Sequence, residues 1–493
     1  MDKTQDMTRS FIKDAVKYLP AQITPGIIGF ISIPIITRLF LPKDYGNYSL
    51  VMATVMVLTT LVGWLPMSII RFYPAYERDK KLDLFSTNII KLTLLSALAV
   101  SVLFLISLVC FKTYISSELY WLMFIGIGVF IAMAVFNVFQ HFLRSKRYVS
   151  WYSGFAIWRS AVGFGVGLGL ILLFKMGIEG LLWGIILCLV VIFPLAWRKA
   201  IDRTSVMFSK VNLPFAKEMA RYSFPLVVGN LAAWILSLSD RYILEFFRGT
   251  QEVGIYSASY NISEKSILLL TGLFGLASGP IAMHIWEREG EEKSADFVSK
   301  ITRYYLIACI PAVIGLSALS KPLMKVMTGA QYFYGYRIIL FVTAGVLLYG
   351  LQQKFQSGFL FHKKTGYITF SIVASGLLNL LLNFIFIPRY GYFAAAITTL
   401  ISYSFLLFLM IIFSRRFFIW KFPFKSLIKV ALAAAIMGVV VYYVSNSLAF
   451  SVLIKLVLSI LLGIFIYFLL LFLLQEFQAS EKNEIKRFLR ISA

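Results

Sequence analysis

The chain has 493 residues, of which 59% are hydrophobic and 14% charged, and its mean hydropathy is +0.82. A soluble domain carries about 25% charged residues, so this composition excludes a soluble enzyme and predicts an all-α integral membrane protein. The formal net charge of +24 also fits a nucleic-acid-binding protein, but the placement of the cations argues against that class.

Apolar runs long enough to cross a bilayer, which takes about 20 helical residues, recur along the whole chain. We predict about fourteen transmembrane helices, at roughly 16–41, 47–70, 86–111, 118–142, 149–174, 178–197, 220–246, 253–284, 302–327, 335–360, 367–388, 391–414, 426–446 and 452–475. With the amino terminus in the cytoplasm, roughly three times as many Lys and Arg fall on the cytoplasmic side as on the other, as the positive-inside rule requires. We therefore expect a multi-pass protein of the cytoplasmic membrane, with both termini cytoplasmic, lipid contacts and no nucleic-acid partner.

The first predicted helix contains three prolines, Pro20, Pro25 and Pro34. Proline removes a backbone donor and permits bending, so this helix is the predicted hinge. Arg38 lies near its outer end. The preceding residues 2–17 have apolar side chains at helical spacing, which fits a short helix at the membrane interface or an unstructured tail.

Weak internal repeats, about 205 to 219 residues apart, occur in the same order in both halves of the chain. The pairs are YGNYS (45–49) with VGIYS (253–257), FLRSKRYVSWYS (142–153) with FHKKTGYITFS (361–371), and KMGIEGLLWG (175–184) with RYGYFAAAIT (389–398). Such repeats are a common transporter plan. They predict two pseudo-symmetric six-helix lobes over 1–213 and 214–420, followed by two additional helices and a tail over 421–493.

Several charged residues lie deep in predicted helices, where an unpaired charge costs about 2.5–3.5 kcal/mol. Arg159 is near mid-depth, and Glu264 and Lys265 lie side by side at a similar depth. The adjacent pair Asp240 and Arg241 lies toward the outer end of its helix. Arg159 and the pair Glu264 and Lys265 fit either a functional cavity or structural bonds between helices. For Asp240 and Arg241 the alternative to a functional role is an anchor at the membrane interface. Lys354 and Arg38 lie closer to helix ends, where the side chain can extend to the interface.

The deep cations outnumber the deep anions, so a cavity lined by them would hold an anion. Arginine suits phosphate well because its planar fork binds two oxygens at once. The glycine-rich stretch GFGVGLGL (163–170) predicts close helix packing rather than a dinucleotide loop, since no strand precedes it. The sequence contains no P-loop, paired-carboxylate motif or nucleophile elbow. We therefore expect no catalytic residue, no metal site and no cofactor.

Several stretches of the sequence resemble one branch of a known superfamily. They are LPAQITPGIIGFISIPIITRLFLPKDYGNYSL, then RFY at 71–73, then YSFPLVVGN, SLSDRYIL and VGIYSASY. This is the polysaccharide-flippase branch of the multidrug/oligosaccharidyl-lipid/polysaccharide (MOP) exporters, whose fold is similar to that of MATE transporters. The resemblance covers essentially the whole chain.

The resemblance implies a flippase that moves a polyprenyl-diphosphate-linked oligosaccharide from the inner to the outer leaflet, by alternating access around a cationic central cavity. It implies cationic residues in the cavity that hold an anionic headgroup, and Arg159, Arg241 and Lys265 fit that description by position. Arg38 and Lys354 are further candidates for the same role. It also implies coupling to H⁺ or Na⁺, for which Asp240 and Glu264 are the candidates. A polysaccharide polymerase and glycosyltransferases would be partners.

Two alternatives remain open at this point. The first is a MATE-type ion-coupled exporter of drugs or metabolites, which the charge sign of the cavity would distinguish. The second is a membrane-embedded polysaccharide polymerase or glycosyltransferase. Such enzymes usually need a large outer loop or an acidic metal-binding pair, and the sequence has neither.

Overall fold

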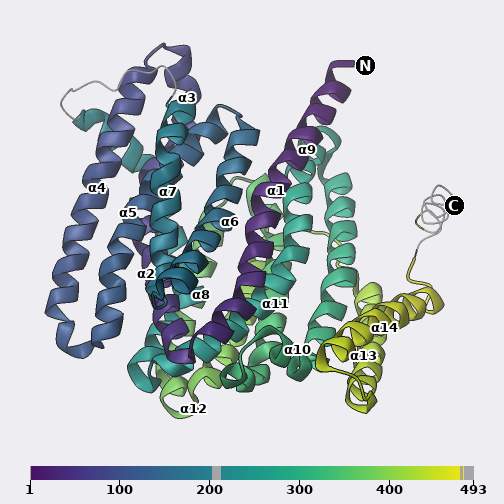
Figure 1. Cartoon of the computed structure of the whole chain (residues 1–493). Coiled ribbons are helices and arrows are strands. Elements are labelled where there is room, and N and C mark those ends of the chain that lie inside the picture. The colour runs from purple at the N-terminus through teal and green to yellow at the C-terminus, as the bar shows by residue number, and fades with distance from the viewer. Residues whose placement is uncertain (1, 202–211, 478–480, 482–493) are drawn as a thin grey trace. The chain divides into compact units, whose positions relative to one another are not determined.

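The computed structural model describes residues 2–201, 212–477 and 481 and is built from helices (Figure 1). No β-strand occurs among these residues. Within the same part of the chain, 11 helices are long and apolar enough to cross a membrane. The prediction of an all-α, multi-pass membrane protein is confirmed.

The helices follow one another with short connections. In the first half of the chain they are α1 (Asp2–Leu39), α2 (Pro42–Val62), α3 (Trp64–Arg78), α4 (Leu82–Cys110), the 3₁₀ turn η1 (Lys112–Tyr114), α5 (Ser117–Ser145), α6 (Val149–Phe174), α7 (Glu179–Ala200) and α8 (Leu213–Arg248). In the second half they are α9 (Thr250–Ala318), α10 (Ser320–Met327), η2 (Ala330–Ile338), α11 (Ile339–Phe361), α12 (Gly366–Ser414), α13 (Phe424–Ser447) and α14 (Val452–Leu473).

Each of the predicted apolar runs falls on a helix, but several boundaries differ. The run 47–70 divides at Gly63 into α2 and α3, and the run 302–327 divides between α9 and α10. Conversely, α9 and α12 each join two predicted runs across a kink, at Gly290 (φ 85°) and Gly391 (φ 59°). Glycine is the residue that adopts positive φ without steric cost, and the backbone leaves helical geometry at both positions. Each of these elements therefore consists of two helical segments, as the separate predicted runs indicate.

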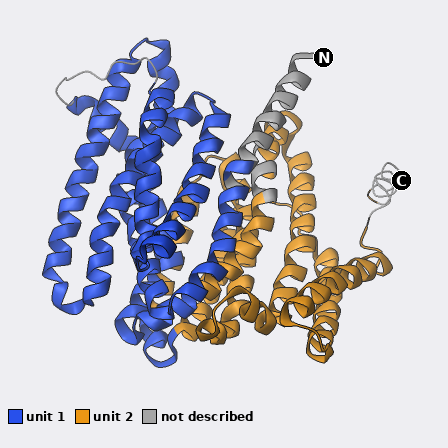
Figure 2. Ribbon diagram, viewed as in Figure 1, with its two compact units in different colours: residues 1–257, 383–391 blue, residues 258–382, 392–493 orange. Residues whose placement is uncertain are grey.

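The chain divides into two compact units, shown in different colours in Figure 2. Unit 1 comprises residues 1–257 and 383–391, and unit 2 comprises 258–382 and 392–493. The two units are defined by compactness alone, so their boundary does not test whether the two halves of the chain are repeats. The predicted lobe boundaries after 213 and 420 stay predictions.

The predicted hinge helix α1 is continuous through Pro20, Pro25 and Pro34. That this helix acts as a hinge during transport stays a prediction. The side chains of residues 1–19 are outside the described part of the structure. The predicted helix of residues 2–17 at the membrane interface therefore stays a prediction.

Unit 1 has an aromatic core at one end of α3, α4, α5 and α8. Phe85 lies at its centre, with ring centroids 6.5 Å from Tyr73, 4.9 Å from Tyr76, 6.0 Å from Phe142 and 5.8 Å from Phe215. Three of these four contacts are edge-to-face, the arrangement that the ring quadrupole favours. The core therefore joins three successive helices, α3, α4 and α5, to α8, which lies much further along the chain.

Close glycine packing joins α6 to α7, as the GFGVGLGL stretch predicts. A Cβ atom on Gly184 would lie 2.5 Å from the carbonyl oxygen of Gly163 and 2.5 Å from the amide nitrogen of Gly167. The other predicted pair, Gly165 and Gly169, has no described atom within 4 Å of such a Cβ. Only the Gly163/Gly167 face is therefore a helix contact.

Two loops that correspond in the repeat end their helices in the same way. The amide of Tyr148 donates to the carbonyl of Leu143 over 2.9 Å, and that of Lys364 donates to Phe359 over 2.8 Å. Both are six-to-one Schellman bonds, and each places a cation in the left-handed region, Arg147 at φ 58° and Lys363 at φ 57°.

In unit 2, an ion cluster joins α9 to the residues that follow α14. The Arg303 guanidinium contacts Glu476 Oε1 at 2.7 Å and Glu481 Oε1 at 2.6 Å, and Tyr304 donates to the same Glu481 oxygen over 2.6 Å. One helical turn further along, Tyr467 of α14 donates to the Ile307 carbonyl over 2.7 Å. The cluster therefore anchors α14 to α9.

Candidate functional site

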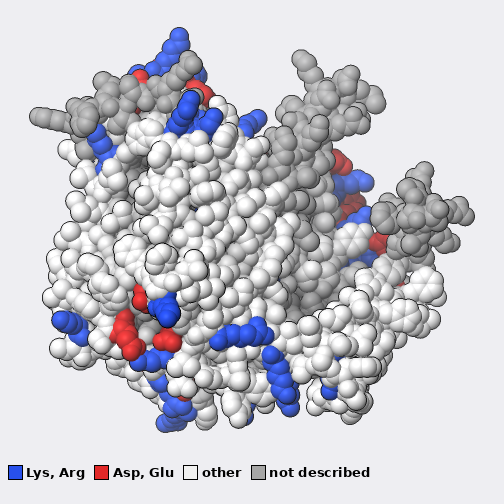
Figure 3. All heavy atoms as spheres, viewed as in Figure 1, with Lys and Arg blue, Asp and Glu red and all other residues white. Residues whose placement is uncertain are grey.

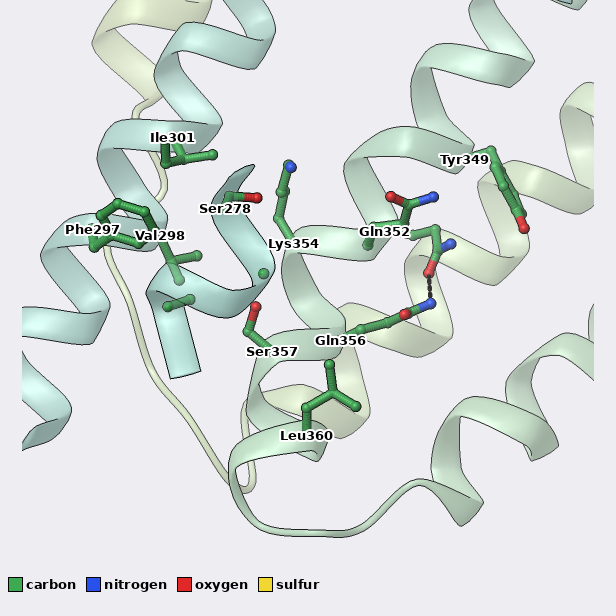
Figure 4. Close-up of a pocket in the computed structure, with 13 residues that line it drawn as sticks. Ser278, Phe297, Val298, Ile301, Tyr349, Gln352, Lys354, Gln356, Ser357 and Leu360 are labelled. Carbon is green, nitrogen blue, oxygen red and sulfur yellow. Dashed lines mark hydrogen bonds between the residues drawn. The ribbon is translucent and has the colours of Figure 1, made fainter. Parts of the chain in front are cut away.

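A polar pocket with a buried lysine lies within unit 2, between α11 and two segments of α9. Its cavity volume is about 270 Å³. Figure 4 shows Ser278, Phe297 and Ile301 of α9 across from the residues of α11, among them Lys354. The Lys354 side chain is only 7% exposed. Its Nζ atom lies 5.5 Å from the ring centroid of Tyr305, so its charge is held over an aromatic face.

The polar lining of the pocket consists of neutral hydrogen-bonding groups around this one cation. They are Ser278, Tyr349, Gln352, Gln353, Gln356 and Ser357. Gln356 Nε2 donates to Gln352 Oε1 over 2.8 Å, which orients both amides. No carboxylate is among the lining residues that the structure describes.

Part of the pocket wall is apolar and packs against a hydrophobic cluster. Ala282 and Val298 line the pocket and also belong to an aromatic cluster with Phe361 and Phe418. Trp286 stacks on Phe361 in this cluster, with ring centroids 4.6 Å apart and planes 7° from parallel. Ala282 and Val298 thus connect the pocket wall to a packed cluster behind it.

This set of groups suits an anion that also carries hydroxyl groups. A lysine ammonium offers three donors and one positive charge, and glutamine and serine both donate and accept. A phosphate oxygen could bind the ammonium while sugar hydroxyls bind the amides. The cavity is near the lower limit of ordinary ligand pockets, which hold about 300–1,000 Å³, so it would take a headgroup fragment rather than a whole oligosaccharide.

Lys354 was one of the predicted binding residues, whereas its polar neighbours were missed. The signal was present in the run LQQKFQSG (351–358), where an otherwise apolar helix carries polar side chains at five of seven consecutive positions. Ser278 had no such signal, because only the packing of α9 on α11 brings it to the pocket.

Arg159 lies on α6 in unit 1 and is half-buried. Its Nη1 atom is 3.6 Å from the sulfur of Met133, and its guanidinium carbon is 5.6 Å from the ring centroid of Phe136. No ion pair to Arg159 occurs among the residues that the structure describes. A sulfur atom and an aromatic face are weak partners for a guanidinium, so its donor capacity is available for an anion.

Arg241 and Asp240 form an ion pair inside unit 1. Arg241 Nη1 lies 3.2 Å from Asp240 Oδ1, with exposed side-chain fractions of 3% and 1%. Arg241 also donates to the Ser237 carbonyl over 3.1 Å, and the hydroxyl of Tyr256 donates to Asp240 Oδ2. These contacts satisfy both charges within the fold. These contacts favour a structural role for the pair, and the predicted roles of Arg241 in headgroup binding and of Asp240 in ion coupling stay predictions.

None of the remaining predicted residues is among the described lining residues of the pocket. Glu264 and Lys265 are half-buried on α9 and interact electrostatically with each other, and neither lines the pocket. Glu264 also interacts electrostatically with Tyr349, which is one of the residues that line the pocket. Arg38 is exposed at the end of α1 and donates to the Pro34 carbonyl over 3.1 Å.

Comparison with known proteins gives one family match. Residues 11–286 match the family described as "Polysaccharide biosynthesis protein". A relative in Haloferax volcanii, described as "Probable low-salt glycan biosynthesis flippase Agl15", is 22% identical over 46% of this chain and 47% of that protein. This chain therefore matches about half of the length of that relative.

Two groups of solved structures are similar in fold. One is described as "Lipid II flippase MurJ, inward closed conformation", with a TM-score of 0.76 and 19% identity, covering 92% of this chain and 98% of that one. The other is an inward-facing multidrug resistance MATE family transporter of the MOP superfamily, with a TM-score of 0.68 and 13% identity, covering 81% and 94%.

Proposed function

Since the chain belongs to the family of polysaccharide biosynthesis proteins, we propose that it is a membrane flippase for a lipid-linked oligosaccharide. The substrate would be a polyprenyl-diphosphate-linked glycan, carried from the inner to the outer leaflet of the cytoplasmic membrane. The chain would act as a transporter, without a chemical step of its own. The names of its glycan-flippase relatives support this role.

The observation that carries the proposal is the lining of the Lys354 pocket. A diphosphate headgroup cannot cross hydrocarbon unaided, because removing its charges from water is prohibitively costly. A buried cation surrounded by neutral amides and hydroxyls replaces part of that hydration. An exporter of lipophilic cations would need acidic groups instead, and the described lining has none.

Arg159 is the proposed second anion contact, in unit 1. Its partners among the described residues, a thioether and an aromatic ring, leave the guanidinium able to bind two phosphate oxygens. Each contact is argued within its own unit, so the two can be tested separately.

The test measures flipping in proteoliposomes that contain a fluorescent polyprenyl-diphosphate oligosaccharide. Loss of one charge-assisted hydrogen bond costs about 1.5–3 kcal/mol, so we expect Lys354→Gln to slow flipping by about 10- to 100-fold. Lys354→Arg should retain more activity, because it keeps the charge. The exposed Lys425 of α13 offers a matched control, and Lys425→Gln should flip at the wild-type rate.

The same assay applies to Arg159, for which Arg159→Ala should abolish flipping and Arg159→Lys should keep a fraction of it. Folding of every variant is checked by size-exclusion profile and melting temperature. Wild-type flipping by a folded Lys354→Gln protein would refute the pocket as headgroup site. Export of lipophilic cations by the wild-type protein, with no flipping, would favour the MATE-type alternative.

A further inference from the structure

A second, apolar cavity lies within unit 1, between α4, α5 and α7. Its volume is about 450 Å³. Its floor is buried, with Thr93, Val138 and Phe139 exposed by 2%, 2% and 3%, whereas the rim residues Leu94 and Val190 are exposed by 49% and 52%. It is therefore a groove that opens at the surface of the unit.

The groove has no free polar group on its floor. Its one polar side chain, Thr93, donates its hydroxyl hydrogen to the Ile89 carbonyl over 2.7 Å. Phe139 packs edge-to-face on Phe193 and on Trp197 of α7, with centroids 5.9 Å and 6.1 Å apart. A preformed apolar groove on a membrane helix bundle is filled by hydrocarbon rather than by water.

One end of this groove carries positive charge. Pro194 lines the groove, and the exposed Arg198 follows it by one helical turn on the same face of α7. On α4, Lys91 precedes the rim residue Leu94 by three positions, which is also the same face. Figure 3 shows Lys and Arg, together with some Asp and Glu, at this end of unit 1, above a largely uncharged face.

The depth of the groove fits one leaflet. Its lining on α7 runs from Val190 to Trp197, which is about 10 Å at 1.5 Å per residue, against a hydrocarbon core of about 30 Å. Trp197 is 40% exposed at the charged end, and tryptophan is enriched at headgroup level. The groove thus extends from the headgroups into the same leaflet.

We propose that this groove is a binding site for one acyl chain of an anionic glycerophospholipid, whose phosphate binds Arg198 with Lys91 nearby. A resident phospholipid fits better than a polyprenyl chain, because the groove ends within one leaflet. This site is independent of the proposed flippase function. It would retain an anionic lipid at α4, α5 and α7 while other lipids exchange.

The experiment uses the full-length protein in nanodiscs of phosphatidylcholine that contain either phosphatidylglycerol or phosphatidylcholine with a photoactivatable acyl chain. After illumination, labelled residues are located by peptide mass spectrometry. We expect the phosphatidylglycerol probe to label the groove residues of α4, α5 and α7 preferentially. One interfacial cation contributes about fivefold to anionic-lipid binding, so Arg198→Gln should reduce this labelling by about fivefold.

Two variants separate occupancy of the groove from general contact with lipid. Leu94→Trp should fill the groove and abolish the labelling. Leu103→Trp, at a 67% exposed position of the same helix, should leave it unchanged. Equal labelling by both probes, labelling of Leu94→Trp at the wild-type level, or displacement of the probe by an equimolar polyprenyl phosphate would each overturn the proposal.

Discussion

The hydroxyl of Ser49 on α2 donates a hydrogen bond to the hydroxyl of Ser257 on α9 over 2.8 Å, and the two serines occupy equivalent places in the internal repeat. They end the segments YGNYS and VGIYS. The glycines of the same segments also meet, since a Cβ on Gly46 would lie 3.0 Å from the amide nitrogen of Gly254. Contact between equivalent residues is the signature of a self-complementary interface. The sequence repeat therefore has a physical counterpart in unit 1.

This glycine crossing should not tolerate a methyl group. A Cβ on Gly254 would lie 1.8 Å from the Pro42 carbonyl oxygen, and one on Gly46 would lie 2.1 Å from that of Thr250. Gly254→Ala should lower the melting temperature in detergent by several degrees, because backbone must move. Gly154→Ala on α6, with no described atom within 4 Å of its Cβ, should be neutral or stabilise by up to about 1 kcal/mol. Equal melting temperatures for both variants would contradict the crossing.

The buried Asp240–Arg241 pair should be a structural element. Asp240→Asn leaves a buried guanidinium without its carboxylate, which typically costs about 3–5 kcal/mol. We expect loss of folded protein on size exclusion, and partial recovery in the double variant Asp240→Asn, Arg241→Gln. The exposed pair Lys43–Glu118 is the control, where Glu118→Gln should cost at most about 1 kcal/mol. A fully folded Asp240→Asn protein that has lost ion-dependent transport would instead assign this residue to coupling.

The Arg303 cluster should contribute to the stability of unit 2. Arg303→Met removes the partner of Glu476 and Glu481, and the uncompensated carboxylates should lower the melting temperature markedly. Adding Glu476→Leu should restore part of the loss, with a coupling energy of about 0.5–3 kcal/mol in a double-mutant cycle. Lys300→Gln, which removes a neighbouring exposed cation, should change little. Strict additivity of Arg303→Met and Glu476→Leu would show that the contact has no energetic weight.

The α6–α7 contact should distinguish two faces of one glycine-rich helix. Gly167→Leu places a side chain where Leu181 Cα is 3.1 Å from the Cβ position, so folded yield should fall sharply. Gly165→Leu points to open space and should express like wild type. The measurement is fluorescence-detected size exclusion of both variants. Equal yields would mean that the helices are not held by this contact.

The sequence predicted the helices well because bilayer thickness constrains the length of each apolar run. It also separated the runs on either side of Gly290 and Gly391, where the structure has non-helical backbone angles. The contact between Asp240 and Arg241 could not be predicted from the sequence. Adjacent helical residues diverge by about 100°, and only the bonds to Ser237 and Tyr256 show how the two side chains turn toward each other.

The candidate site was predictable in part. Lys354 was among the predicted binding residues, but its position near a helix end also fitted a side chain that extends to the interface, whereas the structure buries it. That its neighbours form a pocket follows from the packing of α9 against α11, which pattern analysis does not give. The depth of a charge along a helix is readable from sequence, whereas the direction in which it faces is not.

Arg147 and Lys363 have a consequence for engineering. At both turns the backbone conformation favours glycine, which would relieve about 1–2 kcal/mol of strain, whereas membrane insertion favours a cation. Stability of the folded protein thus favours glycine at these positions, whereas correct orientation during membrane insertion favours a cation. A screen that rewards heat resistance alone would enrich glycine there, and each such exchange would weaken the charge bias from which a cytoplasmic position is predicted for these two turns.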